Sequence, residues 1–186
     1  MAADGNPDNI SIGPGRLYVA VLGTSEPTSA TSTPNVAWRP VGYTEEGSTI
    51  TFDTSFEDIE VAEELDPIDV VNNKTVTTVA FSMAEVTKAN MALALSGIAD
   101  ATSSGSLTPA TPGAELAFMV MWDALDDYTD PDNRRWLFRK VKSKGSIEVA
   151  LQKSPNKALI PVEFQCLKPA GAGSWEAWPN PDGLVF

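Results

Sequence analysis

Apolar and polar residues alternate most regularly between residues 50 and 56. Ile50, Phe52 and Phe56 lie two or four positions apart, with polar residues between them, and a period of two is typical of a β-strand with one buried face. The phase then slips by one residue, so that Ile59 and Val61 continue the apolar set. Because a β-bulge produces such a slip, the pattern predicts a bent strand over about 48–62.

Seven other segments are rich in β-branched and aromatic residues and predict further strands. They cover residues 16–22, 36–41, 74–83, 114–122, 134–141, 147–151 and 160–166. The segment 114–122 is apolar almost throughout, which is typical of a central strand that is covered on both faces. Pro161 has no backbone N–H to donate, so the last strand is expected to lie at an edge there.

One segment, about 84–96, predicts an α-helix. Ser82 and Glu85 have the spacing of a capping box, in which each side chain accepts a hydrogen bond from the other residue's backbone amide. Thr87 is an alternative cap. Apolar residues then recur at helical spacing up to Gly97, which is a suitable stop.

The remaining segments set the fold class and the domain boundary. Two stretches rich in Ser, Thr, Pro and Gly, 24–35 and 99–113, predict surface loops. Together the elements predict a mainly β fold: a β-sandwich or partly closed barrel with one flanking helix and long loops. At 186 residues one domain is expected, spanning 1–168. A C-terminal arm, 169–186, follows it, and its Pro and Gly residues are expected to keep it out of regular elements.

The formal net charge of −12 is unevenly distributed along the chain. Residues 1–69 carry 2 basic and 13 acidic residues, whereas residues 134–168 carry 9 basic and 2 acidic ones. One interpretation is that these blocks mix in space and the polarity cancels. The other is an acidic face and a basic face, which would let identical subunits dock head to tail. The overall charge also disfavours tight binding of nucleic acid, whose affinity depends on Lys and Arg.

Residue types exclude most catalytic and metal-binding chemistry. The chain has no His and a single Cys, which rules out Ser-His-Asp or Cys-His catalysis and zinc sites. Neither a Walker A nor a Rossmann motif is present. Cys166 is in phase with Val162 and Phe164, so it is expected in the core. The acidic stretch 123–133 lacks the Gly and Glu of a calcium loop, and a hairpin tip is expected there. No enzyme activity, metal or cofactor is expected, although composition alone leaves a glycosidase acid–base pair open.

The sequence also shows no recognisable targeting signal. The first residues lack the basic and apolar regions of a signal peptide. No stretch approaches the roughly 18 apolar residues that cross a bilayer. We therefore expect folding in a cytoplasm, without membrane insertion.

Four of the Trp residues fall into two pairs. Trp122 and Trp136 flank the acidic hairpin tip and are expected to pair across two strands. Trp175 and Trp178 lie in the C-terminal arm. An aromatic-rich arm is suited to lie on a neighbouring subunit; the alternatives are that it wraps its own domain or stays without fixed structure.

Residues 15–24, 38–47, 66–68 and 81–90, in this order and at this spacing, resemble a known family. They are similar to the major tail (tail tube) proteins of long-tailed, non-contractile bacteriophages, particularly those of actinobacteria. The resemblance implies a β-sandwich or barrel with one helix, six subunits in a ring, and rings stacked into a tube. A tape-measure protein would fill the tube and a tail terminator would end it. DNA would pass through the lumen without specific binding, and the protein would lie in the virion tail.

From the residues we add a hypothesis on assembly. Strands near 48–62 and 74–83 extend a sheet between subunits, and the acidic loop 57–69 reaches the next ring or subunit. The candidate contact residues are Glu57, Asp58, Glu63, Glu64, Asp66, Arg134, Arg135, Arg139, Trp175 and Trp178. Two alternative functions remain: a head-decoration or head–tail joining subunit, and a carbohydrate-binding β-sandwich that stacks sugars on the two C-terminal Trp residues.

Overall fold

The computed structural model describes residues 15–95, 107, 116–124, 134–144, 147–149 and 157–178. These residues form eight strands and one helix. The elements are β1 (Arg16–Val21), β2 (Arg39–Pro40), β3 (Thr44–Ile59), β4 (Asp69–Met83), α1 (Lys88–Ala94), β5 (Phe118–Asp123), β6 (Arg135–Ser143), β7 (Ile160–Cys166) and β8 (Trp175–Trp178).

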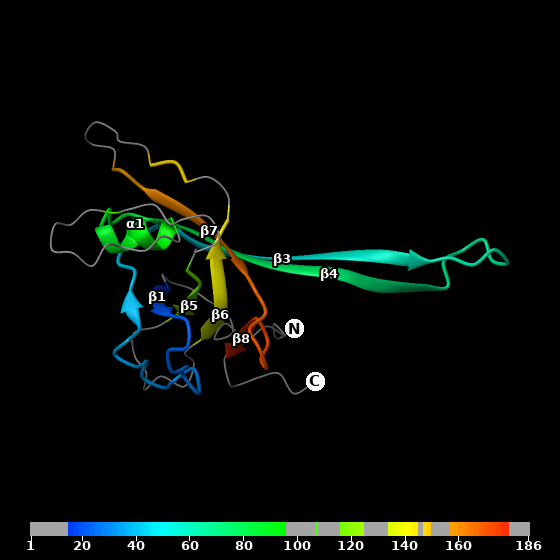
Figure 1. Cartoon of the computed structure of the whole chain (residues 1–186), viewed down its shortest axis with the longest axis horizontal. Coiled ribbons are helices and arrows are strands. Elements are labelled where there is room, and N and C mark those ends of the chain that lie inside the picture. Colours follow the sequence, from blue (N-terminus) through cyan, green and yellow to red (C-terminus); the bar gives the residue numbers. More distant parts are fainter. Residues whose placement is uncertain are drawn as a thin grey trace, which may run out of the picture.

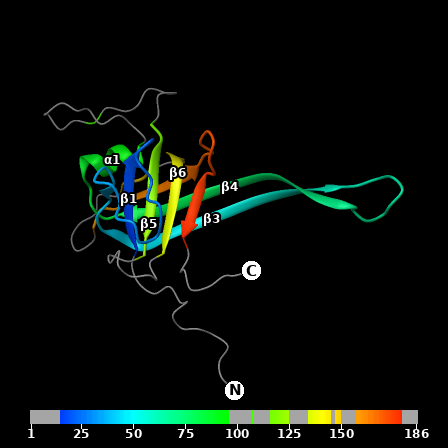
Figure 2. The ribbon, with the colours of Figure 1, turned by 90° about the horizontal axis from the view of Figure 1, so that it is seen from below.

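All eight strands belong to one antiparallel sheet that turns at β6 (Figure 1). The order is β2-β1-β5-β6-β7-β4-β3, and β8 pairs with β6. One edge of β6 pairs with β5. The opposite edge pairs with β8 over Arg135–Phe138 and with β7 over Val141–Ser143. In Figure 2, β1, β5 and β6 run at a steep angle to β3 and β4. The sheet is therefore divided at β6 into two halves with different strand directions.

The main core lies between these two halves. It combines apolar side chains of β1, β5 and β6 with those of β4 and β7, and α1 adds Leu93 and Ala94. Its buried strand residues include Leu17, Val19, Val120, Phe138, Val79, Phe81, Ile160 and Phe164. The predicted mainly β fold with one flanking helix is confirmed, and the described strands do not close into a barrel.

Strand β5 is covered on both faces, as its continuous apolar sequence predicts. Val120 belongs to the main core. Met119 and Met121 point to the other face, where they form a second cluster with Leu137 and Trp38. Burial of three successive residues is possible here because β5 lies between β1 and β6 and both faces of this half are covered.

The helix is shorter than the sequence predicts. It spans Lys88–Ala94 and begins at Thr87, whose Oγ1 accepts a hydrogen bond from a backbone N–H of the first turn (3.2 Å). The predicted capping box does not form. Ser82 lies in strand β4, opposite Pro161 of β7. The Glu85 carboxylate accepts a hydrogen bond from the backbone N–H of Tyr43 (3.1 Å). Ser82 is thus part of a strand rather than a helix start, and the Glu85 side chain is bonded to another segment.

The two predicted strands on either side of the acidic loop form one long hairpin, β3 and β4. The predicted irregularity is present, as a register shift next to Ser55. Its extra residue is Asn73 of β4, however, because Ser55 and Phe56 pair with Lys74 and Asn72. Strand β3 therefore keeps its alternation through the irregularity. As a result, Phe56 and Ile59, three positions apart, lie on opposite faces.

Two predictions about regular structure are wrong. Residues 147–149 do not form a strand; Ile147 and Val149 alternate because both pack against the core. The C-terminal arm does contain a regular element, β8. It forms because β7 pairs with only one end of β6, which leaves the Arg135–Phe138 edge for β8. Gly97 and residues 125–133 lie outside the described residues.

Pro161 agrees with its expected edge position. It lies in β7 opposite Ser82 of β4, outside the stretch Phe164–Cys166 that pairs with β6. The missing N–H therefore removes no hydrogen bond from the β6–β7 ladder.

Cys166 is buried in the core, as its phase predicts. Burial raises the pKa of its thiol from 9.0 to about 12. Above pH 9 the unfolded chain therefore loses a proton that the folded chain keeps, and stability falls by about 1.4 kcal/mol per pH unit until the folded pKa is reached. Between pH 8 and 10.5 we expect the wild type to lose about 2 kcal/mol more than Cys166→Ala.

Urea unfolding of both proteins at the two pH values checks this prediction. The Lys and Tyr residues that ionise in the same range are common to both proteins, so the difference isolates the thiol. Equal pH dependence in the two proteins would contradict it.

Candidate functional site

The outer part of the β3–β4 hairpin projects from the body of the molecule (Figures 1 and 2). Strand β7 accompanies β4 only over Thr78–Met83. Beyond that point β3 and β4 pair with each other, and every residue from 55 to 75 is exposed. We call residues 55–75 the distal hairpin.

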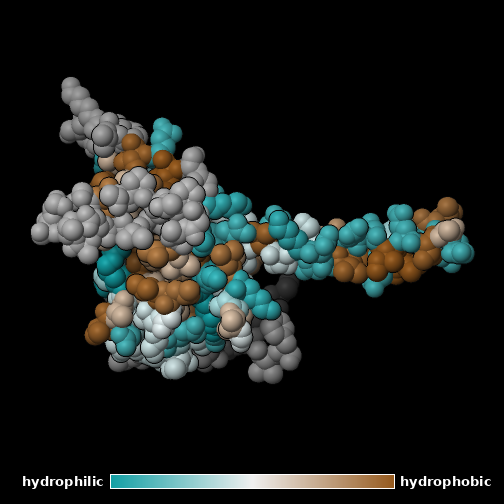
Figure 3. Space-filling view, viewed as in Figure 1, coloured by the Kyte–Doolittle hydropathy of each residue, from teal (hydrophilic) through white to brown (hydrophobic). Residues whose placement is uncertain are grey.

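The distal hairpin exposes large apolar side chains, which appear as brown areas along it in Figure 3. The exposed fraction is 64% for Phe56, 104% for Leu65 and 56% for Ile68. An isolated two-stranded hairpin is at best marginally stable in water, and contiguous exposed apolar surface marks sites of protein association. The distal hairpin therefore has the properties of a segment that is buried in an assembly.

The distal hairpin is also strongly acidic. It carries seven carboxylates and one Lys, a net charge of −6. The predicted acidic contact residues all lie within it and are all exposed: Glu57, Asp58, Glu63, Glu64 and Asp66. The structure thus brings the whole acidic set together on one projecting element.

Arg135, a predicted contact residue, is instead buried inside its own chain. Its guanidinium forms a two-point ion pair with Asp123 (Nη2–Oδ2 2.8 Å, Nε–Oδ1 3.3 Å), and neither side chain is exposed. Nη1 donates to the carbonyl oxygens of Ser29 and Ser32 (2.7 and 2.8 Å). Arg135 therefore anchors the predicted surface loop on the body, and its side chain is not exposed in this conformation.

Arg139 joins two other segments of its own chain. Nε donates to the Glu26 carboxylate (2.9 Å), and Nη2 forms an ion pair with Glu176 of β8. Partial burial lowers the pKa of this guanidinium, but hydrogen bonds and Coulomb attraction from the two carboxylates outweigh it and raise the pKa above its ordinary value. Arg134 lies next to β6 and is half-buried. The basic block is thus partly neutralised within the molecule.

Trp175 and Trp178 are placed on opposite faces of β8, because they lie three residues apart in a strand. Trp175 packs on Phe52 and Trp136, with ring centroids 5.2 and 5.6 Å away. Trp178 packs against the second cluster. The two rings form no common platform for a sugar, and residues 169–178 lie on their own domain. Trp136 also pairs with Trp122 across β5 and β6, as predicted.

Phe52 is a functional candidate that the sequence reasoning did not single out. It lies where the hairpin leaves the body, and its ring contacts both Trp136 and Trp175. The contact connects the base of the hairpin with β8. The available signal was its place in the alternating set, between Ile50 and Phe56.

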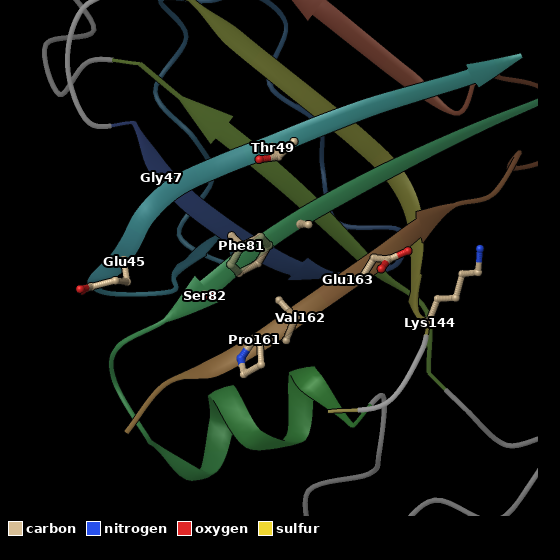
Figure 4. A pocket seen from close by; sticks show the side chains of 10 residues that line it. Glu45, Gly47, Thr49, Phe81, Ser82, Lys144, Pro161, Val162 and Glu163 are labelled. Carbon is tan, nitrogen blue, oxygen red and sulfur yellow. The ribbon is translucent and has the colours of Figure 1, made fainter. Parts of the chain in front are cut away.

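An open groove of about 560 Å³ lies along β3, β4 and β7 (Figure 4). Short side chains, including Thr49, Ala80 and Ser82, line it together with Lys144 and Glu163. Among the described residues, no group of three or more Cys, Asp or Glu side chains could hold a metal ion. The lining has the character of an open protein surface, since small-molecule sites are usually enclosed and apolar.

A scan against protein-family models matches residues 3–183 to the phage tail tube protein family. The chain belongs to the phage tail tube proteins. The match extends beyond the four segments that first showed the resemblance and confirms it. A search of the curated proteins finds no match.

Membership of the family sets the general role of this tail tube protein. It is a structural component of the virion tail, it is not an enzyme, and it assembles with itself into a tube. The glycosidase alternative is thereby excluded. The one helix that the structure describes is too short to span a membrane.

Proposed function

We propose that this tail tube protein forms hexameric rings, that the rings stack into the tail tube, and that the lumen conducts DNA into the host. A tape-measure protein occupies the lumen during assembly, and a tail terminator ends the tube. The observation that carries the proposal is the distal hairpin, which is long, exposed, apolar and acidic at once.

The reach of the distal hairpin supports contact with a neighbouring subunit. At about 3.3 Å per residue, a hairpin with some ten residues in each direction extends roughly 30 Å beyond the body. Among the described residues, no further strand pairs with the outer backbone edges of the distal hairpin, and free edges promote association of chains. The acidic residues from Glu57 to Asp66 are therefore the proposed contacts with the next ring or subunit.

The net charge supports passage of DNA without adhesion. At −12 for one chain, a ring of subunits repels the phosphate backbone, and few Lys or Arg residues are available to displace its counterions. DNA bound tightly to the wall would not move through it.

Electron microscopy of the purified protein at rising concentration tests the proposal. We expect tubes, and six-fold symmetry in their end views. Discrete rings that do not stack would favour a head–tail joining role, and monomers at every concentration would contradict self-assembly.

Reversing the charge of the hairpin tip should block assembly. In the triple variant Glu63→Lys, Glu64→Lys and Asp66→Lys, three charges change sign on a fully exposed segment, which shifts the net charge by six units, and the monomer should fold normally. Each exposed ion pair contributes up to about 1 kcal/mol. The critical concentration for tube formation should therefore rise by more than about tenfold, which light scattering measures.

The neutral variant Glu63→Gln, Glu64→Gln and Asp66→Asn is the matched control. It removes attraction without adding repulsion and should have an intermediate effect. Normal tubes from the Lys variant would refute the assignment of this loop to an interface.

A further inference from the structure

The part of the β3–β4 hairpin next to the body, which we call the root, differs from the distal hairpin in where its apolar residues lie. At the root, Ile50 and Val79 form one cross-strand pair that faces the core. The next pair, Thr49 and Ala80, lines the open groove on the other face. One apolar face and one polar face are usual for a sheet that is covered on a single side.

The distal hairpin has apolar side chains on both faces instead. Directly paired residues of antiparallel strands point to the same face, and residues two apart on a strand do so as well. The extra residue on β4 therefore leaves β3 in phase. The first face of the distal hairpin carries Phe56, Asp58, Val70 and Asn72, and the second carries Glu57, Ile59, Val71 and Asp69.

The two faces have the same number of apolar side chains. Each has one pair of apolar side chains at diagonal positions, Phe56 with Val70 on the first face and Ile59 with Val71 on the second. These four side chains are between 40% and 64% exposed. Each face also has at least one carboxylate. A hairpin that docked through one face would leave two apolar side chains of the other face in water.

From this arrangement we infer that the distal hairpin is buried on both faces in the tube, inserted between surfaces of further copies of this chain. The inference rests on the proposed function and adds the geometry of the contact. Each hairpin then joins at least two neighbouring surfaces, and each of these surfaces has apolar side chains bordered by basic ones.

The body of the same chain offers both kinds of side chain. Lys144 and Lys168 are exposed in the basic segment 134–168, which holds 9 basic and 2 acidic residues. Tyr43 is 80% exposed and Val21 71%. A distal hairpin of net charge −6 is complementary in charge to this basic segment, which makes a further copy the fitting partner.

Two double variants test the two faces separately. Phe56→Ser with Val70→Ser changes the first face, and Ile59→Ser with Val71→Ser changes the second. We expect each to raise the critical concentration for tubes by on the order of 100-fold, because burial of two large apolar side chains is lost in each case. Asn73→Ser, at the extra residue of β4 that has no partner in the register, is the control in the same segment and should assemble almost normally.

Accessibility in wild-type-like tubes provides a second measurement that does not depend on loss of assembly. Phe56→Cys and Val71→Cys each place one thiol on one face, while the native Cys166 is buried. Alkylation of each new thiol should be at least about tenfold slower in tubes than in monomers.

The outcomes separate this inference from the proposed function. Loss of assembly from both double variants, with protection of both thiols, supports it. Loss and protection on one face only would overturn two-sided burial while leaving tube formation in place. Normal tubes from both double variants would overturn any role of the apolar faces of the distal hairpin, and a wild type that never forms tubes would overturn the proposed function itself.

Discussion

Shortening the hairpin should give a protein that folds but forms no tubes. Ser55 and Lys74 are cross-strand partners, so a two-residue Asn-Gly turn can replace residues 56–73 without changing the register. All removed residues are exposed, and the loss of the monomer's stability should be small. Assembly loses several apolar side chains, each contributing about 1.5–3 kcal/mol when fully buried. We therefore expect the critical concentration to rise by more than about 100-fold, measured by light scattering and electron microscopy.

A shorter deletion is the matched control. Replacing only residues 60–68 with the same turn keeps the Ile59–Asp69 pair and both faces of the distal hairpin. Its effect on assembly should be smaller than that of the full deletion, and circular dichroism should show an unchanged β signal for both. Normal tubes from the full deletion would show that the body alone makes every essential contact.

Removing Arg135 should destabilise the monomer rather than the tube contact. In Arg135→Met the Asp123 carboxylate, which has 0% exposure, loses its two-point ion pair with Arg135, and two loop carbonyl oxygens lose a donor. Loss of one partner of a buried ion pair costs about 3–5 kcal/mol. For a chain of this size the melting temperature should fall by about 6–20 °C. Thermal unfolding of the monomer measures this fall, and urea unfolding measures the loss in free energy of unfolding.

The neighbouring Arg134→Met is the control for this variant, since its side chain is half-buried and its effect should stay below about 1 kcal/mol. Adding Asp123→Leu to Arg135→Met should recover part of the stability, because the buried carboxylate that has lost its Arg135 ion pair is then removed as well. A stable Arg135→Met monomer that fails only in assembly would instead restore the contact role first expected for Arg135.

Much of the fold was accessible from periodicity. The two-residue alternation of β3 and the continuous apolar run of β5 reflect how many faces of a strand are buried, and burial is a local property of each side chain. The predicted helix lies in the right place but begins too early. Its expected first turn includes Glu85, whose side chain instead bonds to Tyr43, a residue 42 positions away. For residues 147–149 a strand was predicted where none forms. Ile147 and Val149 pack against the core, and this packing alone produced the strand-like pattern.

The candidate site was predicted in part. The acidic residues Glu57 to Asp66 lie together on the distal hairpin, as the charge run suggested. The basic residues could not be assigned in the same way, because a charge in the sequence does not reveal whether its partner lies within the chain. Phe52 was missed because its partners come from β6 and β8, and the pattern of β3 alone identifies neither.

The sequence by itself determined that this tail tube protein is mainly β, that Cys166 belongs to the core and that one acidic segment stands apart. Only the tertiary structure decided that Arg135 is an internal anchor, that the C-terminal segment adds a strand to β6, and that the distal hairpin is apolar on both faces. The reason is the distance along the chain over which each feature is set. Periodicity is read within a few residues, whereas Arg135 bonds to the carbonyl of Ser29 across 106 positions, and a strand's register depends on the strand with which it pairs.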